Sequence, residues 1–196
     1  TPLDKYFIED SIRDKFTVRL VYQPRLVNCH LQDDNLENIL HTDVDISDID
    51  DIDDIDDIED LPQETRQRIA QNLNKINSFL LNRQRIEMVG KDIASHFKAN
   101  CDGKFKALLI APNRYGCILY KKELDKYLRT DDSEVLISNN KDKNTNNPAK
   151  QAINDFIDQN TDKSESDIID HFKESEQPKI LIVTSKLLTG FDAPVL

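Results

Sequence analysis

A short apolar run near the end of the sequence is followed by residues whose types suit contact with a nucleotide or a nucleic acid. The run covers residues 179–184 and ends at Thr184, and Thr189-Gly190-Phe191-Asp192 follows after an apolar turn. Glycine lets the backbone approach a phosphate or a sugar closely. A carboxylate beside it can accept hydrogen bonds from ribose hydroxyls or hold an arginine of a neighbouring domain. The same residues also fit an ordinary strand followed by a glycine turn and an aspartate N-cap, so the spacing alone leaves both interpretations open.

Asn113 and Arg114 form a second candidate group, directly after the apolar run of residues 106–111. If a helix follows that run, both residues lie at its N-terminus, where backbone N–H groups favour anions such as phosphates. The alternative is that Asn113 only caps the helix and that Arg114 is solvated. For each residue taken singly, this alternative is at least as good as phosphate contact.

Other chemistry is not indicated by the sequence. The chain has only four glycines and no phosphate-binding loop of the GxxxxGK[ST] type. Its cysteines and histidines show no metal-ligand spacing, so no metal site is expected; they are Cys29, Cys101, Cys117, His30, His41, His96 and His171. Unpaired cysteines without a CxxC pair favour a cytoplasmic protein with reduced thiols. No apolar run approaches the length that would cross a membrane, and the first residues do not resemble a signal peptide.

The spacing of apolar residues predicts the elements that must position these candidates. We predict an α/β fold with a parallel sheet covered by helices on both faces, because continuous apolar strands alternate with helices. The predicted strands cover residues 106–111, 134–138 and 179–184. The predicted helices cover residues 84–99, 115–128, 149–157 and 164–172, with a turn at Asp102-Gly103 and a polar, asparagine-rich loop at 139–148.

The first part of the chain is less regular. A short helix or connector is expected at residues 5–14, a strand at 16–22 and a helix at 63–82. Between them, residues 43–60 contain eleven acidic residues and no basic one, with isoleucine at every third position. That period rotates around a helix, so the residues cannot face one core, and we expect a solvated acidic segment. Binding of a basic partner is the less favoured alternative.

The net charge of −11 comes from this segment. Removing its eleven acids from the total of 37 leaves 26, which equals the number of lysines and arginines. The remainder of the chain is therefore neutral, and the acidity does not argue against nucleic-acid binding elsewhere.

Several of these segments together resemble one family of enzymes. The run that ends in LLTGFDAP resembles motif V of superfamily 2 nucleic-acid motors, in the form found in the motor and nuclease (R) subunit of type I restriction enzymes. The string LLIAPNR resembles motif IV of the same motors, and SIRDKFTVRLVYQPR resembles the strand that enters their second motor domain. One departure is Lys186-Leu187-Leu188, which replaces an acidic residue common after this strand in superfamily 2. It leaves in doubt any contact made by that acid.

The resemblance implies that the chain is an incomplete second RecA-like domain that ends before motif VI. In this interpretation residues 1–30 are a connector and the first strand, 31–83 an acidic and helical insertion, and 84–196 the domain core. It implies that Gly190 and Asp192 sense the nucleotide. It further implies nucleic-acid contacts by Asn113, Arg114, Thr184 and Thr189.

The whole subunit, by the same resemblance, is an ATP- and Mg²⁺-dependent enzyme that translocates double-stranded DNA and cuts it. Its partners would be the methylation and specificity subunits. Because the phosphate loop and the Mg²⁺-binding acid belong to the first motor domain, these 196 residues are expected to have no catalytic residue, no bound cofactor and no activity alone. The alternatives are another superfamily 2 DNA helicase and a non-enzymatic acidic binding module.

Overall fold

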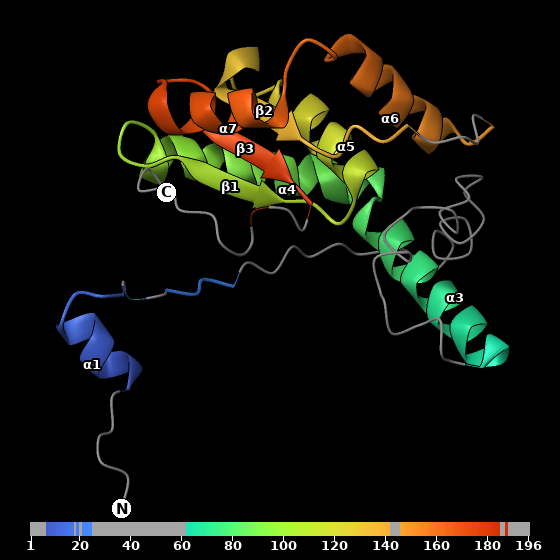
Figure 1. The fold of residues 1–196 in the computed structure, drawn as a ribbon, viewed down its shortest axis with the longest axis horizontal. Coiled ribbons are helices and arrows are strands. Elements are labelled where there is room, and N and C mark those ends of the chain that lie inside the picture. The colour runs from blue at the N-terminus through green and yellow to red at the C-terminus, as the bar shows by residue number, and fades with distance from the viewer. Residues whose placement is uncertain are drawn as a thin grey trace, which may run out of the picture.

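A three-stranded parallel sheet forms the centre of the protein (Figure 1). The computed structural model describes residues 7–17, 19, 21–24, 62–141, 146–184 and 187. The strands are β1 (Ala107–Ile110), β2 (Ser133–Leu136) and β3 (Ile180–Val183), in the spatial order β1-β3-β2. The register pairs Ala107 and Ser133 with Ile180. All three predicted strands and the parallel sheet are therefore confirmed.

Three helices cover one face of the sheet. They are α4 (Arg83–His96), α5 (Arg114–Leu124) and α6 (Pro148–Gln159), and each matches a helix predicted from apolar spacing. Their inward residues join one side of each strand in a continuous core. Its fully buried members include Cys117, Leu124, Ile180 and Ile182. Burial of this apolar surface is the main force that holds the helices on the sheet.

Among the described elements, one helix, α7 (Glu165–Glu174), packs on the opposite face. Phe172 of this helix is fully buried against Leu181 and Val183, which alternate along β3 with the residues of the first core. Successive strand residues point to opposite faces of a sheet, which explains how the four apolar residues of β3 supply both cores. The prediction of helices on both faces is confirmed.

Lys179 connects several segments at the amino edge of the sheet, where the strands begin. Its backbone N–H donates to the carbonyl oxygen of Asp132, and its Nζ donates to Oδ1 of Asp102 at 2.8 Å. The hydrogen bond from Lys179 lowers the pKa of Asp102, and the same bond raises the pKa of Lys179. Asp102 belongs to the predicted turn, in which Gly103 has a φ of +74°. The turn is therefore confirmed, and it is linked to the starts of β2 and β3.

The N-terminal elements agree with the predictions only in part. Helix α1 (Ile8–Arg13) and helix α3 (Gln63–Leu80) form where they were expected. The predicted strand at 16–22 is wrong for the residues of that stretch that the structure describes, which adopt bends or irregular backbone. Phe16 and Tyr22 are 80% and 84% exposed, so no core surface fixes the alternating pattern. The acidic run at 43–60 lies outside the described residues.

No helix in the described ranges is both long and apolar enough to cross a bilayer.

Candidate functional site

The carboxyl edge of the sheet, at which the strands end, brings the described candidate residues into one region. The backbone N–H of Ala111 donates to the carbonyl oxygen of Val183 at 2.8 Å, so the segments that leave β1 and β3 start side by side. Asn113 and Arg114 follow β1, and Thr184 follows β3. Ligands of open parallel sheets bind at this edge. The sequence therefore placed these three residues correctly with respect to the sheet.

Asn113 is the N-cap of α5 and is completely buried. Its side-chain oxygen Oδ1 accepts a hydrogen bond from the backbone N–H of Gly116 at 2.8 Å. Its Nδ2 group is also buried, and it has no hydrogen-bond partner among the described residues. The capping interpretation is thus correct for Oδ1. Since an unpaired buried donor is costly, the amide nitrogen is left available for an acceptor that the capping role does not supply.

Arg114 is buried and is not solvated, in contrast to the alternative considered from the sequence. Its Nη1 donates to the backbone carbonyl of Asn140 at 2.6 Å. Asn140 belongs to the segment that leaves β2, so Arg114 links the carboxyl ends of β1 and β2. A guanidinium has several donors in a fixed plane. One donor of Arg114, Nη1, holds the segment that leaves β2. Phosphate contact by Arg114 stays a prediction.

Sequence reasoning predicted α6 but did not name as candidates the residues at its N-terminus, which follows β2. Asn147 caps α6, its Oδ1 accepting from the backbone N–H of Ala149 at 2.9 Å, and Pro148 occupies the first turn. Lys150, two residues after Pro148, is buried despite its charge. Asn-Pro at the start of an apolar helical pattern is an N-terminus signal, and it could have identified Asn147. Nothing in the sequence could have indicated that Lys150 is buried.

The structure describes only one of the four candidates that follow β3. Thr184 is half-buried at the end of β3, whereas Thr189, Gly190 and Asp192 lie outside the described residues. Leu187, between them, packs against the α7 core and has a positive φ of 64°. A positive φ is uncommon for a leucine, and it shows that the backbone turns at Leu187. The described residues contain no group of three or more histidines, cysteines or acids that could hold a metal ion.

Comparison with known proteins gives one consistent result. The chain is 37% identical, over 99% of its length, to a protein of Methanocaldococcus jannaschii named as the MjaVIIP endonuclease subunit of a type I restriction enzyme. It is 34% identical, over the same share, to the MjaVIIIP endonuclease subunit of that organism, and 26% identical to the MjaIXP endonuclease subunit. The chain is therefore homologous to type I restriction enzyme endonuclease subunits.

The matched part of these relatives is small. The chain spans 19% of the length of the MjaVIIP and MjaVIIIP subunits and 17% of the MjaIXP subunit. No family model matches the chain. No solved structure matches it either.

Proposed function

We propose that this chain forms part of the second RecA-like motor domain in the DNA-translocating endonuclease subunit of a type I restriction enzyme. The observation that carries the proposal is its similarity to such subunits over 99% of the chain. The parallel sheet, with helix N-termini after β1 and β2, supports it. A motor domain needs this arrangement because it grips a phosphate backbone at the carboxyl edge of its sheet.

The individual roles follow from position at that edge. Asn113 is completely buried, so its role would be to hold the N-terminus of α5, whose backbone N–H groups would face a DNA phosphate. Arg114, Thr184 and Thr189 add further contacts to the backbone of the DNA. Gly190 and Asp192 respond to the nucleotide, with the glycine permitting close approach and the carboxylate accepting hydrogen bonds.

The cofactors would be ATP and Mg²⁺, held chiefly by the first motor domain, which these residues do not include. Double-stranded DNA would be the substrate of the complete subunit, and the methylation and specificity subunits its partners. Nucleotide binding between two such domains stabilises a closed arrangement, and hydrolysis releases it. Because both domains must contribute, we expect the 196-residue chain to show neither ATPase nor nuclease activity alone.

The test is the Asp192→Ala variant of the complete endonuclease subunit, assembled with its methylation and specificity subunits. We expect DNA-stimulated ATP hydrolysis to fall by about 10²-fold or more, because a group that stabilises the closed nucleotide site is lost. DNA binding by the assembled complex should remain, since Asp192 is placed at the nucleotide. Steady-state phosphate release and a gel-shift titration measure the two effects.

The matched control is Asp170→Ala, which removes the same carboxylate from the exposed face of α7. It should hydrolyse ATP at the wild-type rate. Equal activity of Asp192→Ala and Asp170→Ala would rule out the nucleotide role. Absence of any ATP hydrolysis in the wild-type complex would remove the motor proposal and favour the binding-module alternative.

A further inference from the structure

Helix α3 stands apart from the sheet and the helices that cover it (Figure 1). It is 18 residues long, and among the described elements its main neighbour is α4, which begins shortly after α3 ends. Helices in proteins owe most of their stability to the packing of one apolar face. The free length of α3 therefore indicates a partner beyond the described part of the chain.

The carboxyl end of α3 is anchored on the body of the protein. Arg85 of α4 donates from Nη1 to the hydroxyl oxygen of Tyr120 on α5 at 3.2 Å, and its guanidinium lies 5.6 Å from the centre of the Phe79 ring. Leu81, the C-cap of α3, lies so close to Gly116 of α5 that a Cβ on this glycine would be 3.2 Å from Leu81 Cδ2. These contacts fix the direction in which α3 leaves the body.

Before this anchor, α3 leaves large apolar side chains uncovered. Ile76 is 54% exposed and Phe79 is 39% exposed. Leu80, which shares a helix face with Ile76 one turn away, is half-buried. Exposed apolar side chains that gather on one element mark an interaction surface.

The spacing of apolar residues along α3 fits a helical partner. In the sequence, apolar residues recur at intervals of four, three and four, at Ile69, Leu73, Ile76 and Leu80. This spacing is that of a seam along which two helices interlock. The positions that flank the seam are uncharged: Ala70, Asn72, Asn77 and Phe79. Because charges at flanking positions select charged partners, their absence here favours a helix whose contact face is apolar.

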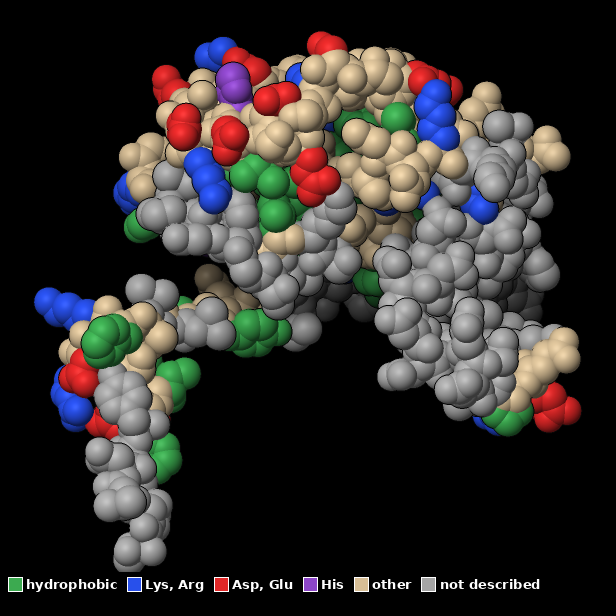
Figure 2. All heavy atoms as spheres, in the orientation of Figure 1, with side chains coloured by type: hydrophobic (Ala, Val, Ile, Leu, Met, Phe, Trp, Pro, Cys, Tyr) green, Lys and Arg blue, Asp and Glu red, His purple; other side chains and the backbone are tan. Residues whose placement is uncertain are grey.

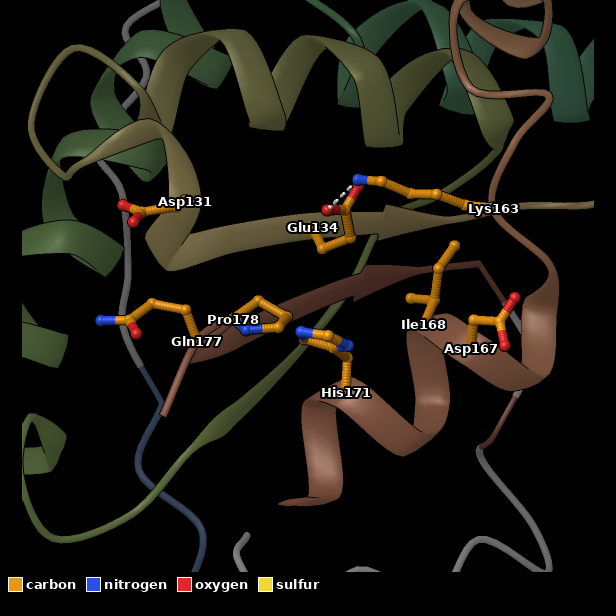
Figure 3. Close-up of a pocket in the computed structure, with 8 residues that line it drawn as sticks. All are labelled: Asp131, Glu134, Lys163, Asp167, Ile168, His171, Gln177 and Pro178. Atoms are coloured by element: carbon orange, nitrogen blue, oxygen red, sulfur yellow. Dashed lines mark hydrogen bonds and ion pairs between the residues drawn. The ribbon is translucent and has the colours of Figure 1, made fainter. Parts of the chain in front are cut away.

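The surface over α7 has a different character. A cavity of about 350 Å³ lies between β2, α7 and Pro178 (Figure 3), and acidic side chains (red) gather over this region in Figure 2. Carboxylates that line the cavity already have partners, since Glu134 is paired with Lys163 at 2.8 Å and Asp167 accepts from the Ser164 hydroxyl at 2.6 Å. This surface is polar and internally paired, whereas the seam of α3 is apolar and uncovered.

We propose that α3 docks through its seam onto an amphipathic helix from another region of the complete endonuclease subunit. The chain spans 19% of the length of the MjaVIIP and MjaVIIIP subunits, so most of each relative lies outside the matched part. The acidic run at 43–60 does not suit this role, because isoleucines spaced by three rotate around a helix and form no single seam. The proposal rests on the relationship to these subunits and is independent of the motor role, which ATP hydrolysis tests separately.

The test is maleimide labelling of Ile76→Cys in the 196-residue chain and in the complete subunit, with the modified peptide quantified by mass spectrometry. In a dilute solution of the 196-residue chain we expect fast labelling, since Ile76 is exposed. In the complete subunit labelling should be about tenfold slower or more, because a docked helix keeps the reagent from the thiol. The matched control is Arg68→Cys, at an exposed position of α3 outside the seam, which should react at the same rate in both proteins.

Each other outcome would overturn the proposal. Equal labelling rates of Ile76→Cys in the two proteins would mean that the seam has no partner in the complete subunit. Slow labelling of the 196-residue chain would identify another cover: a second copy if the rate falls with protein concentration, or the chain itself if the rate is slow at every concentration. Equal slowing of Arg68→Cys and Ile76→Cys in the complete subunit would mean that the helix is enclosed on all sides and does not dock by one seam.

Discussion

The two ends of the central sheet use polar residues differently. At the amino edge, charged side chains are paired with each other: Lys179 with Asp102, Lys163 with Glu134, and Arg129 with Asp131. The amino edge also has backbone-bonded side chains, since buried Asp132 accepts from the backbone N–H of Arg129 and Lys106 donates to the carbonyl oxygens of Phe172 and Ser175. At the carboxyl edge, the side chains of Asn113, Arg114 and Asn147 are all buried and bonded to the backbone. Asn113 and Asn147 cap helices, and Arg114 holds the carbonyl of Asn140.

The ion pairs of the amino edge join neighbouring segments, whereas the buried caps of the carboxyl edge orient helix N-termini. Exposed ion pairs join neighbouring segments but contribute little to stability, because solvent screens them. Buried caps fix the backbone direction of a helix N-terminus, which is what a phosphate site requires. The contrast predicts that substitutions at the carboxyl edge cost more than those at the amino edge. The three predictions below test that order with free energies of unfolding from chemical denaturation.

The largest effect is expected for Arg114→Met at the carboxyl edge. The change keeps much of the apolar stem but removes the donor to Asn140, and we expect a loss of about 1 to 2 kcal/mol. Hydrogen exchange of residues 137–141 should become faster, since the segment after β2 loses its anchor. The control is Arg83→Met on α4, whose side chain is 90% exposed, and it should change stability by less than about 0.5 kcal/mol. Equal losses in the two variants would contradict the positioning role of Arg114.

A smaller effect is expected for Asn113→Ala. It removes the cap of α5, and the loss should be about 1 kcal/mol, because the N–H of Gly116 loses its acceptor in a buried place. Loss of the unpartnered Nδ2 offsets part of the cost. The matched change is Ser164→Ala, which removes the cap of α7 at an exposed position. It should cost less than Asn113→Ala, since water can replace the exposed cap. The reverse order would show that burial at the carboxyl edge has no special importance.

The sequence was most informative where one physical signal dominated. The apolar runs at 106–111 and 179–184 predicted strands because both faces of a parallel strand are buried, and the heptad-like spacing of Ile86 and Ile93 predicted α4. The alternation at 16–22 misled, because strand pairing needs a partner and alternation alone does not supply one. Phe16 is exposed, so the alternating apolar residues gain no burial in the described structure.

The candidate site was predictable in place but not in detail. Asn113 and Arg114 were expected at a helix N-terminus after a strand, and they lie there. That Arg114 is buried and bonded to Asn140 depends on how two segments 26 residues apart meet, and local sequence does not contain that information. The same holds for the burial of Lys150.

The smallest effect is expected for the amino-edge variant Asp102→Asn, and its pH dependence has a defined sign. The pKa of Asp102 is lowered by the hydrogen bond from Lys179, so its contribution is present above the unfolded-state pKa of about 4 and is lost as pH falls through the folded-state pKa. The carboxylate is 40% exposed, which limits the loss at pH 7 to about 0.2 to 1 kcal/mol. Wild type and Asp102→Asn should therefore differ in stability at pH 7 and converge as pH falls below the folded-state pKa of Asp102, because the carboxyl is then protonated in the folded and the unfolded state. A gap that persists at low pH would mean that Asp102 acts through the shape of its turn, and a loss larger than that of Arg114→Met would reverse the proposed order of the two edges.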